Sequence, residues 1–340
     1  MLSLFNYVTA KVKRVADVAA LTAFATFWVM LPVHSIVFPF VFLATSWWMC
    51  TVGFFFVYLF WHRATSSLPS KGGVAINFFR GCWPWRTIRN YFKHKIVKTA
   101  ELPSDRNYIM GSHPHGVLAI GATLTFAAKV SGFHKIFPGL DPCILVLDGI
   151  FSWPFLRECA AVIGAKRASG DSLKYLLNNP GKGRAIGIVI GGLNESLTAR
   201  QGLYYIKLKE RKGFIRHALA SGASLVPCFH FGEMQLYDQV SGSDEGRLKN
   251  MIARIRNITG FFPPLLTGKS VFGLPTGGLL PYERPVTTVI GAPIDVDKVE
   301  EPTEEEIDKL HGKYCKALEE LFEEHKLNYG IEPETHLQLY

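Results

Sequence analysis

The stretch NYIMGSHPHGVLAIGATL, residues 107–124, decides the fold of this chain. Its apolar run Tyr108–Gly111 has the length and composition of a buried strand, and the apolar residues from Gly116 to Val130 fit a helix. In between, Pro114 fixes one φ angle and Gly116 lets the backbone turn tightly. The stretch therefore predicts one strand–turn–helix unit of an α/β fold.

The same alternation continues through the chain after residue 63. Short apolar runs and amphipathic stretches follow one another, which predicts a largely parallel or mixed sheet covered by helices. Further strands are expected at Ile144–Leu147, Ala161–Ile163, Ile186–Ile190, Leu225–Phe229 and Thr287–Ile290. Further helices are expected at Leu173–Asn178, Gly213–Ser221 and Arg247–Asn257, and a last amphipathic helix at the capping box formed by Thr303 and Glu306.

Residues 18–62 contain no Asp, Glu, Lys or Arg. One bilayer span needs about 20 apolar residues, so the segment can form two helices. Basic residues flank it on both sides, which places both ends in the cytosol. We predict a cytosolic basic segment at 1–17, a membrane hairpin at 18–62 and a catalytic domain at 63–340. A buried helix pair is the alternative, and a cleaved signal peptide is disfavoured because the run is too long.

The composition excludes several classes of protein. Hydrophobic residues make up 48% of the 340 and charged residues 19%, which is incompatible with a disordered chain. Six cysteines without a C-x-x-C pair are too few for a disulfide scaffold. The net charge of +9 indicates an anionic binding partner. No RNA-binding signature, Walker A loop or G-x-S-x-G is present, which leaves a phosphorylated small molecule or an anionic membrane.

The turn His113-Pro114-His115-Gly116 is the strongest chemical signal. It places an imidazole at the predicted start of a helix, where the helix dipole disfavours imidazolium. A neutral imidazole can accept a proton, as a general base must. Two alternatives remain open: a structural pair of histidines that caps the helix, and an H-x-H metal pair, for which no third ligand is recognisable nearby.

Three further groups of polar residues accompany this turn. The run Gly191-Gly192-Leu-Asn194-Glu195-Ser196 follows a predicted strand, and its carboxylate can orient His115, bind a substrate hydroxyl or cap a helix. The run Phe231-Gly232-Glu233 follows another strand. A basic stretch is either a solvated face or a binding site for phosphates, and it comprises Lys207, Lys209, Arg211, Lys212 and Arg216.

These pieces, in this order, resemble the type 2 diacylglycerol acyltransferase family, which includes monoacylglycerol and wax-alcohol acyltransferases. The resemblance runs from about residue 85 to the end of the chain. One departure is Tyr91-Phe92-Lys93, where many members have Tyr-Phe-Pro. The matching text is HPHGVLAIGA from 113, FPGL from 137, GGLNESL from 191, RKGFIRHALASGASLVPCFHFGE from 211, RPVTTVIGAPI from 284 and HGKYCKALEELFEEHK from 311.

The resemblance implies a glycerolipid-acyltransferase-like αβ sandwich that lies against the membrane. It implies acyl-CoA-dependent esterification of diacylglycerol to triacylglycerol, with monoacylglycerol or a long-chain alcohol as alternative acceptors. His115 would be the base and Glu195 would orient its ring, because Ile120 stands where glycerolipid acyltransferases carry the Asp of H-x-x-x-x-D. His113 completes the catalytic set and shapes the turn or binds substrate. Backbone N–H groups at the Gly116 helix start would meet the oxyanion.

The remaining expectations also follow from the resemblance. Acyl-CoA is a co-substrate, and neither a cofactor nor a metal is expected. The partners are acyl-CoA, the acylglycerol and the lipid bilayer, with no nucleic acid; a homo-oligomer remains open. The expected location is the endoplasmic reticulum membrane, with movement to lipid droplets. Substrate-binding residues are expected at Pro114, Gly116, Asn194, Ser196, Arg200, Arg211, Lys212 and Arg216.

Overall fold

The computed structural model describes most of the chain after residue 36. The described residues are 11–12, 15, 19, 21–22, 37–71, 75–179, 181–196, 200–239, 250, 254, 266–270, 278 and 280–340. Two expected elements fall on the remainder. The first half of the hairpin, 18–36, and the helix Arg247–Asn257 lie outside the described residues apart from isolated positions.

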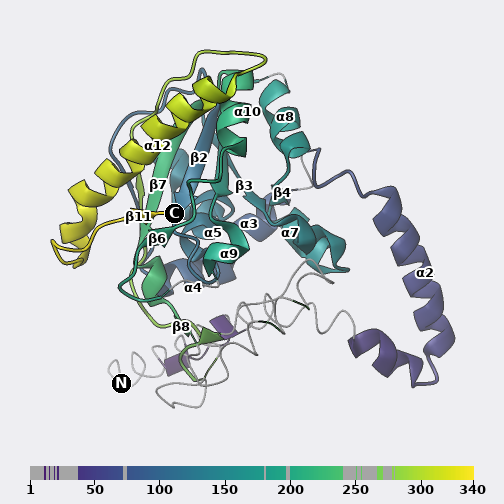
Figure 1. Cartoon of the computed structure of the whole chain (residues 1–340). Helices are drawn as coiled ribbons and strands as arrows, with labels where there is room; N and C mark the ends of the chain where they lie inside the picture. Colours follow the sequence, from purple (N-terminus) through teal and green to yellow (C-terminus); the bar gives the residue numbers. More distant parts are fainter. Residues whose placement is uncertain are drawn as a thin grey trace.

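A seven-stranded sheet forms the centre of the described part (Figure 1). Its neighbours pair in parallel except β10 and β7, which pair antiparallel. The predicted parallel or mixed sheet is therefore confirmed. In spatial order the strands are β1 (Lys95–Lys98), β10 (Thr287–Ile290), β7 (Ser224–Phe231), β2 (Tyr108–His113), β5 (Arg184–Val189), β3 (Asp141–Val146) and β4 (Lys166–Arg167).

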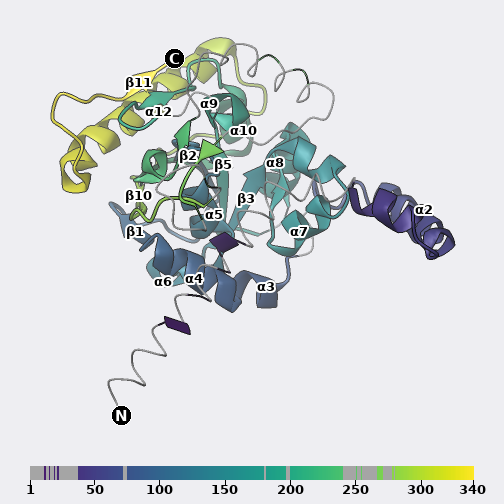
Figure 2. The same ribbon diagram turned by 90° about the horizontal axis from the view of Figure 1, so that it is seen from below.

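Helices cover both faces of this sheet (Figure 2). Side chains of β2 alternate between them: Ile109 enters one core, while Tyr108 and Met110 enter the other. The Ile109 face packs against α8 (Gly170–Asn178), α10 (Gly213–Ser221) and α12 (Glu304–His325). The opposite face carries α3 (Asn77–Gly81), α4 (Trp83–Tyr91), α5 (Ile120–Phe126), α6 (Phe133–Ile136) and α7 (Leu156–Val162).

Shorter elements complete the described part. Two small sheets pair β6 with β11 in parallel and β8 with β9 antiparallel. These strands are β6 (Tyr205–Ile206), β8 (Asp238–Gln239), β9 (Leu266–Thr267) and β11 (Gln338–Leu339). Besides α9 (Gly192–Ser196), single 3-10 turns occur at η1 (Lys129–Ser131), η2 (Asp148–Ser152), η3 (Glu233–Gln235) and η4 (Lys326–Tyr329).

Most of the expected elements are present, with two corrections. The predicted strand Ala161–Ile163 is wrong, because these residues end helix α7; a short apolar run rich in alanine does not distinguish a strand from a buried helix. The predicted helix Gly116–Val130 is shorter, since α5 begins only at Ile120. Gly116 and Ala119 have φ angles of 57° and 51°, which an α-helix cannot accommodate.

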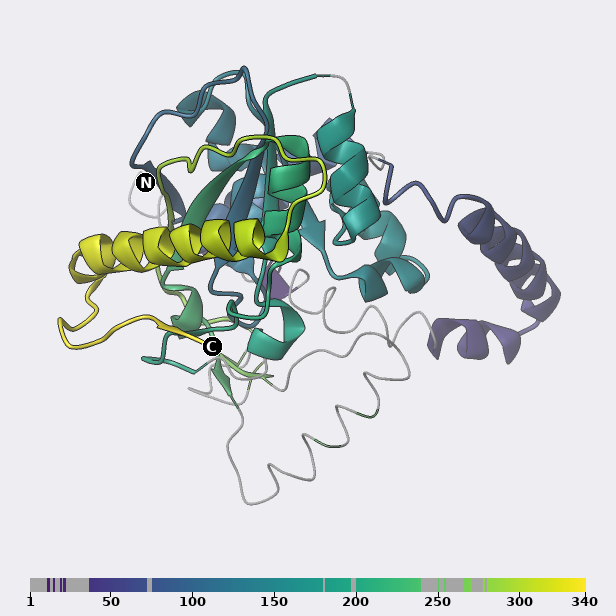
Figure 3. The ribbon, with the colours of Figure 1, turned by 45° about the horizontal axis from the view of Figure 1, so that its top comes forward.

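Helix α2 (Trp48–Ala64) extends away from the sheet (Figure 3). Its second half contacts the rest of the chain: Tyr58 donates a hydrogen bond to Glu158 over 2.7 Å and accepts one from the Phe155 N–H over 2.9 Å. Arg157 also donates to the His62 carbonyl over 2.6 Å. Most other large side chains of α2 are exposed and apolar, including Phe56 and Phe60. Within the described residues, we find no helix with the length and hydropathy needed to cross a bilayer.

Helix α12 begins with the predicted capping box. The Glu306 N–H donates to the Thr303 hydroxyl over 3.2 Å, and the Glu306 carboxylate accepts from the Thr303 N–H over 2.8 Å. The apolar face of α12 covers β7, and the buried Tyr314 lies on this face. Its hydroxyl donates to the Gly111 carbonyl over 3.2 Å and lies 3.0 Å from His113 Nε2. The last helix of the chain thereby fixes the end of β2.

We expect Tyr314→Phe to lower the free energy of unfolding by roughly 1–3 kcal/mol, because it leaves His113 Nε2 and the Gly111 carbonyl buried without their partner. Thermal unfolding of the detergent-solubilised protein measures this change. The matched control is Tyr175→Phe, which removes a hydroxyl from a partly exposed side chain. Equal unfolding midpoints for the two variants would show that the Tyr314 hydroxyl does not stabilise β2.

Candidate active site

The His-Pro-His-Gly turn lies at the carboxyl end of the central strand β2. This strand ends at His113, lies between β7 and β5, and runs parallel to both. Residues 114–119 then form a turn before α5 starts. Because the carboxyl ends of parallel strands meet at one edge of a sheet, side chains that follow β5 and β7 can converge on this turn.

The His115 ring is held as a neutral base. Its Nδ1 lies 3.1 Å from the Gly116 carbonyl oxygen, which can only accept a hydrogen bond, so Nδ1 carries the proton. This leaves Nε2 with a free lone pair. Burial lowers the pKa of His115 and is the largest influence on it, in place of the helix dipole expected from the sequence. The ring can therefore accept a proton through Nε2 near neutral pH.

Glu195 contacts the main chain of His115. It lies in α9, after β5, and only 1% of it is exposed. One carboxylate oxygen accepts a hydrogen bond from the His115 N–H, and the other accepts from the Lys207 N–H over 3.0 Å. The sequence predicted a contact with the ring instead. Glu195 is thus brought to His115 as expected, but it holds the backbone of the turn.

The surroundings of the Glu195 carboxylate determine its position and its pKa. A Cβ atom at Gly191 would lie 1.9 Å from Glu195 Oε2, so only glycine leaves room for the carboxylate there. Burial raises the pKa of Glu195 to about 7, while the two N–H donors and the Arg211 guanidinium lower it. The group therefore titrates close to neutral pH.

His113 lies buried at the end of β2. It is fully buried, and burial lowers its pKa to about 3, so it stays neutral. Tyr314 donates its proton to Gly111, so the His113 Nε2–H donates to the Tyr314 oxygen. The nitrogen of His113 that faces Tyr314 therefore carries a proton and is not a base. The interpretation that His113 shapes the turn fits this geometry better than a role as the base.

The predicted substrate-binding residues are divided between the turn and the surface. Pro114 and Gly116 belong to the turn, and Asn194 and the buried Ser196 belong to α9 with Glu195. The basic residues differ from one another. Lys212 forms an ion pair with Asp308 and Arg216 pairs with Glu304 over 2.6 Å, so both connect α10 to α12. Arg200 is exposed, whereas the half-buried Arg211 acts on Glu195; their role in binding phosphates stays a prediction.

Glu233 is a second buried carboxylate at this site, and its sequence pattern predicted no role for it. It follows β7 in η3 and is 2% exposed. Its two oxygens accept hydrogen bonds from the Ile120 N–H over 2.9 Å and the Gly121 N–H over 2.8 Å. These two N–H groups at the start of α5 are therefore occupied. The oxyanion donors that the sequence predicted at Gly116 lie in the turn, before this helix begins. The sequence signals for Glu233 were the Phe231-Gly232-Glu233 run after a predicted strand and its place in a stretch that matches the family.

Two further histidines, His94 and His230, belong to a buried polar cluster. The Thr288 hydroxyl lies 3.1 Å from His94 Nε2 and 2.9 Å from His230 Nδ1, and 2.9 Å from the Thr125 hydroxyl. Burial lowers the pKa of both histidines to about 3, so both are neutral. Across the described part of the chain, no group of three or more His, Cys, Asp or Glu side chains is arranged to hold a metal ion.

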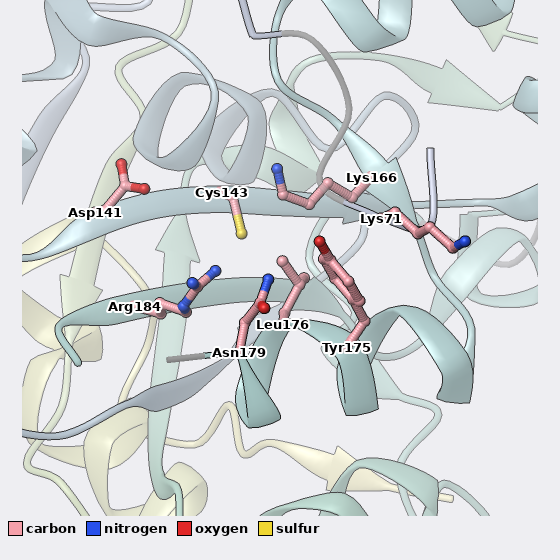
Figure 4. Close-up of a pocket in the computed structure, with 8 residues that line it drawn as sticks. All are labelled: Lys71, Asp141, Cys143, Lys166, Tyr175, Leu176, Asn179 and Arg184. Atoms are coloured by element: carbon pink, nitrogen blue, oxygen red, sulfur yellow. The ribbon is translucent and has the colours of Figure 1, made fainter. Parts of the chain in front are cut away.

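A separate cavity of about 160 Å³ lies between α8 and the strands β3, β4 and β5 (Figure 4). Its lining is basic on balance, and it contains none of the predicted catalytic residues. It lies towards the β4 edge of the sheet, whereas His115 follows the central strand β2. The geometry therefore gives it no part in proton transfer. The lining residues are Lys71, Asp141, Cys143, Lys166, Tyr175, Leu176, Asn179 and Arg184.

Comparison with known proteins identifies the family. A family model described as diacylglycerol acyltransferase matches residues 40–340. Human 2-acylglycerol O-acyltransferase 3 is 38% identical over 96% of this chain and 94% of its own. Mouse diacylglycerol O-acyltransferase 2 is 40% identical over 86% of this chain and 74% of its own. Human acyl-CoA wax alcohol acyltransferase 1 is 40% identical over 91% of each chain.

A solved structure is also similar. It is the 1-acyl-sn-glycerophosphate acyltransferase PlsC from Thermotoga maritima, with a TM-score of 0.41 and 11% identity over 94% of this chain and 97% of that one. The assignment itself comes from the sequence matches. Because one family model spans residues 40–340 and relatives of the same kind share 38–40% identity over most of their length, the chain belongs to the diacylglycerol acyltransferase family.

Proposed function

We propose that this protein transfers an acyl group from acyl-CoA to diacylglycerol and so forms triacylglycerol. The observation that supports this most directly is the His115 ring, whose Nδ1 faces the Gly116 carbonyl and whose Nε2 is the basic nitrogen. The relatives named as diacylglycerol O-acyltransferase 2 support diacylglycerol as the acceptor. Acyl-CoA serves as co-substrate, and the reaction needs no other cofactor.

In this mechanism Nε2 of His115 removes the proton from the acceptor hydroxyl. The hydroxyl oxygen attacks the thioester carbonyl, and the tetrahedral intermediate then expels the CoA thiolate as the new ester forms. The imidazolium returns its proton to the thiolate, so no acyl-enzyme is required. General-base catalysis of this kind contributes roughly 10²–10⁴-fold to the rate. The Gly116 carbonyl keeps the proton on Nδ1 throughout, and Glu195 holds the His115 main chain in place.

We expect His115→Ala to lower kcat by roughly 10²–10⁴-fold in membranes that contain the variant at the wild-type level. The control is His336→Ala, which alters a histidine that is largely exposed. Burial lowers the pKa of His115, so its neutral form persists below pH 6.5, and an acid limb of kcat near pH 7 would report protonation of Glu195 and not of His115. Full activity of His115→Ala would exclude His115 as the base.

The three kinds of relative carry names with different acceptors. A 2-monoacylglycerol or a long-chain alcohol presents the same hydroxyl to His115. We expect membranes that contain the protein to form labelled triacylglycerol from labelled oleoyl-CoA and added diacylglycerol. Faster labelling of diacylglycerol from monoacylglycerol, or of wax ester from a fatty alcohol, would show that monoacylglycerol or the alcohol is the preferred acceptor. The proposed catalytic residues would stay the same.

We also propose that the apolar segment 18–62 lies in the membrane of the endoplasmic reticulum, with both ends of the chain in the cytosol and lipid droplets as a second location. The support is the exposed apolar surface of α2, where Phe56 is 76% and Phe60 74% exposed. Apolar patches of this kind are rarely left in contact with water. Both substrates carry acyl chains that reside in the bilayer, so an embedded α2 would keep the active site near them.

Cys50 provides a probe for this arrangement, because it lies on α2 and is exposed. In a variant that keeps Cys50 as its only cysteine, we expect a membrane-impermeant maleimide to label opened membranes only after detergent is added. The control is Glu320→Cys in the cysteine-free background, on the exposed face of α12, which should react without detergent. Equal labelling of both sites without detergent would show that α2 lies in water.

A further inference from the structure

We propose that Glu233 is a positioning residue for His115, and that it keeps the catalytic turn in the conformation that leaves Nε2 as the base. This inference rests on the proposed function, because it concerns the same reaction and the same base. Glu233 does not touch the reacting atoms. It acts through the main chain of Gly116 and through the first residues of α5.

The first contact is with the start of helix α5. The first N–H groups of a helix lack partners within the helix and need an acceptor. The residue that precedes α5, Ala119, has a φ angle of 51° and no side chain that could cap it. The Glu233 carboxylate supplies the acceptor from a distant part of the chain, with one oxygen for Ile120 and the other for Gly121. A carboxylate is also the group that the positive end of a helix dipole favours.

The second contact is with Gly116. A Cβ atom at this position would lie 2.6 Å from Glu233 Cγ and 2.9 Å from its Oε1, so the glycine backbone packs directly on the Glu233 side chain. The φ angle of Gly116, 57°, orients the carbonyl that accepts the hydrogen bond from His115 Nδ1. The Glu233 side chain therefore packs against Gly116, whose carbonyl determines which nitrogen of His115 carries the proton.

The strand order explains why the two carboxylates reach one turn. Strand β2 lies between β5 and β7, and all three run parallel. Glu195 follows β5 and binds the N–H of His115, while Glu233 follows β7 and binds N–H groups beyond the turn. Each neighbour of β2 thus contributes one buried carboxylate to opposite ends of the same turn. Removal of either one should allow the turn to relax.

The test uses the full chain in membranes and the variant Glu233→Gln, which keeps the size of the side chain. An amide can accept from only one of the two N–H groups, and its own NH₂ group faces the other. We expect kcat to fall at least tenfold, with KM for oleoyl-CoA and for diacylglycerol within twofold of wild type, because neither substrate touches Glu233. The control is Glu283→Gln, an exposed carboxylate, which should match wild type in both constants.

A double-mutant cycle separates positioning from a general loss of structure. Gly116→Ala places a methyl group against Glu233, so it disturbs the same contact from the other side. If the two residues act together, the double variant should lose about as much kcat as the more severe single variant. Multiplied losses in the double variant, or a kcat for Glu233→Gln within twofold of wild type, would overturn the proposal.

Two further measurements cover the remaining outcomes. If Glu233→Gln does not accumulate as folded protein, Glu233→Asp carries the test: its shorter side chain cannot reach Gly116, so a lowered kcat with unchanged KM is expected, and wild-type kcat contradicts the proposal. His115→Ala serves as the reference. Full activity in that variant refutes the proposed function itself, whereas an inactive His115→Ala with a normal Glu233→Gln refutes only the role of Glu233.

Discussion

Two buried carboxylates bind main-chain N–H groups at the two ends of one turn, and the geometry of the site depends on them. Glu195 binds the N–H of His115, and Glu233 binds those of Ile120 and Gly121. Burial of a carboxylate costs free energy unless it is hydrogen-bonded, and both groups meet that cost with two N–H donors each. The turn contains two residues with positive φ and would not hold this shape through its own sequence.

The chemical consequence is a base whose tautomer is set by a carbonyl group. In a Ser-His-Asp triad a carboxylate faces the imidazole and stabilises the imidazolium. Here the Gly116 carbonyl takes that place on Nδ1, and the carboxylates act on the backbone. In the proposed reaction the leaving group is a thiolate, and the imidazolium returns its proton to that thiolate after it has left. Thiols have pKa values near 8.5, so a thiolate departs without full protonation by His115.

The sheet brings these groups together because its central strands are parallel. The strands β5, β2 and β7 end at one edge, so the residues that follow them share one space although they lie far apart in sequence. Helix α12 covers one face of the sheet, and its Tyr314 hydroxyl binds His113 and the Gly111 carbonyl. The exposed apolar helix α2 stands apart from this arrangement and is joined to it through Tyr58. The His115 turn and the exposed apolar surface of α2 therefore belong to separate elements.

The sequence by itself determined the alternating strands and helices, the capped last helix and the turn around His115. Local patterns in the sequence encode these features: apolar periodicity, glycine and proline at the turn, and a capping box. Only the tertiary structure decided where α5 begins, that Glu195 holds the main chain, and that Glu233 belongs to the site. Those contacts join residues 80 to 113 positions apart, and they depend on strand order, which no local pattern encodes.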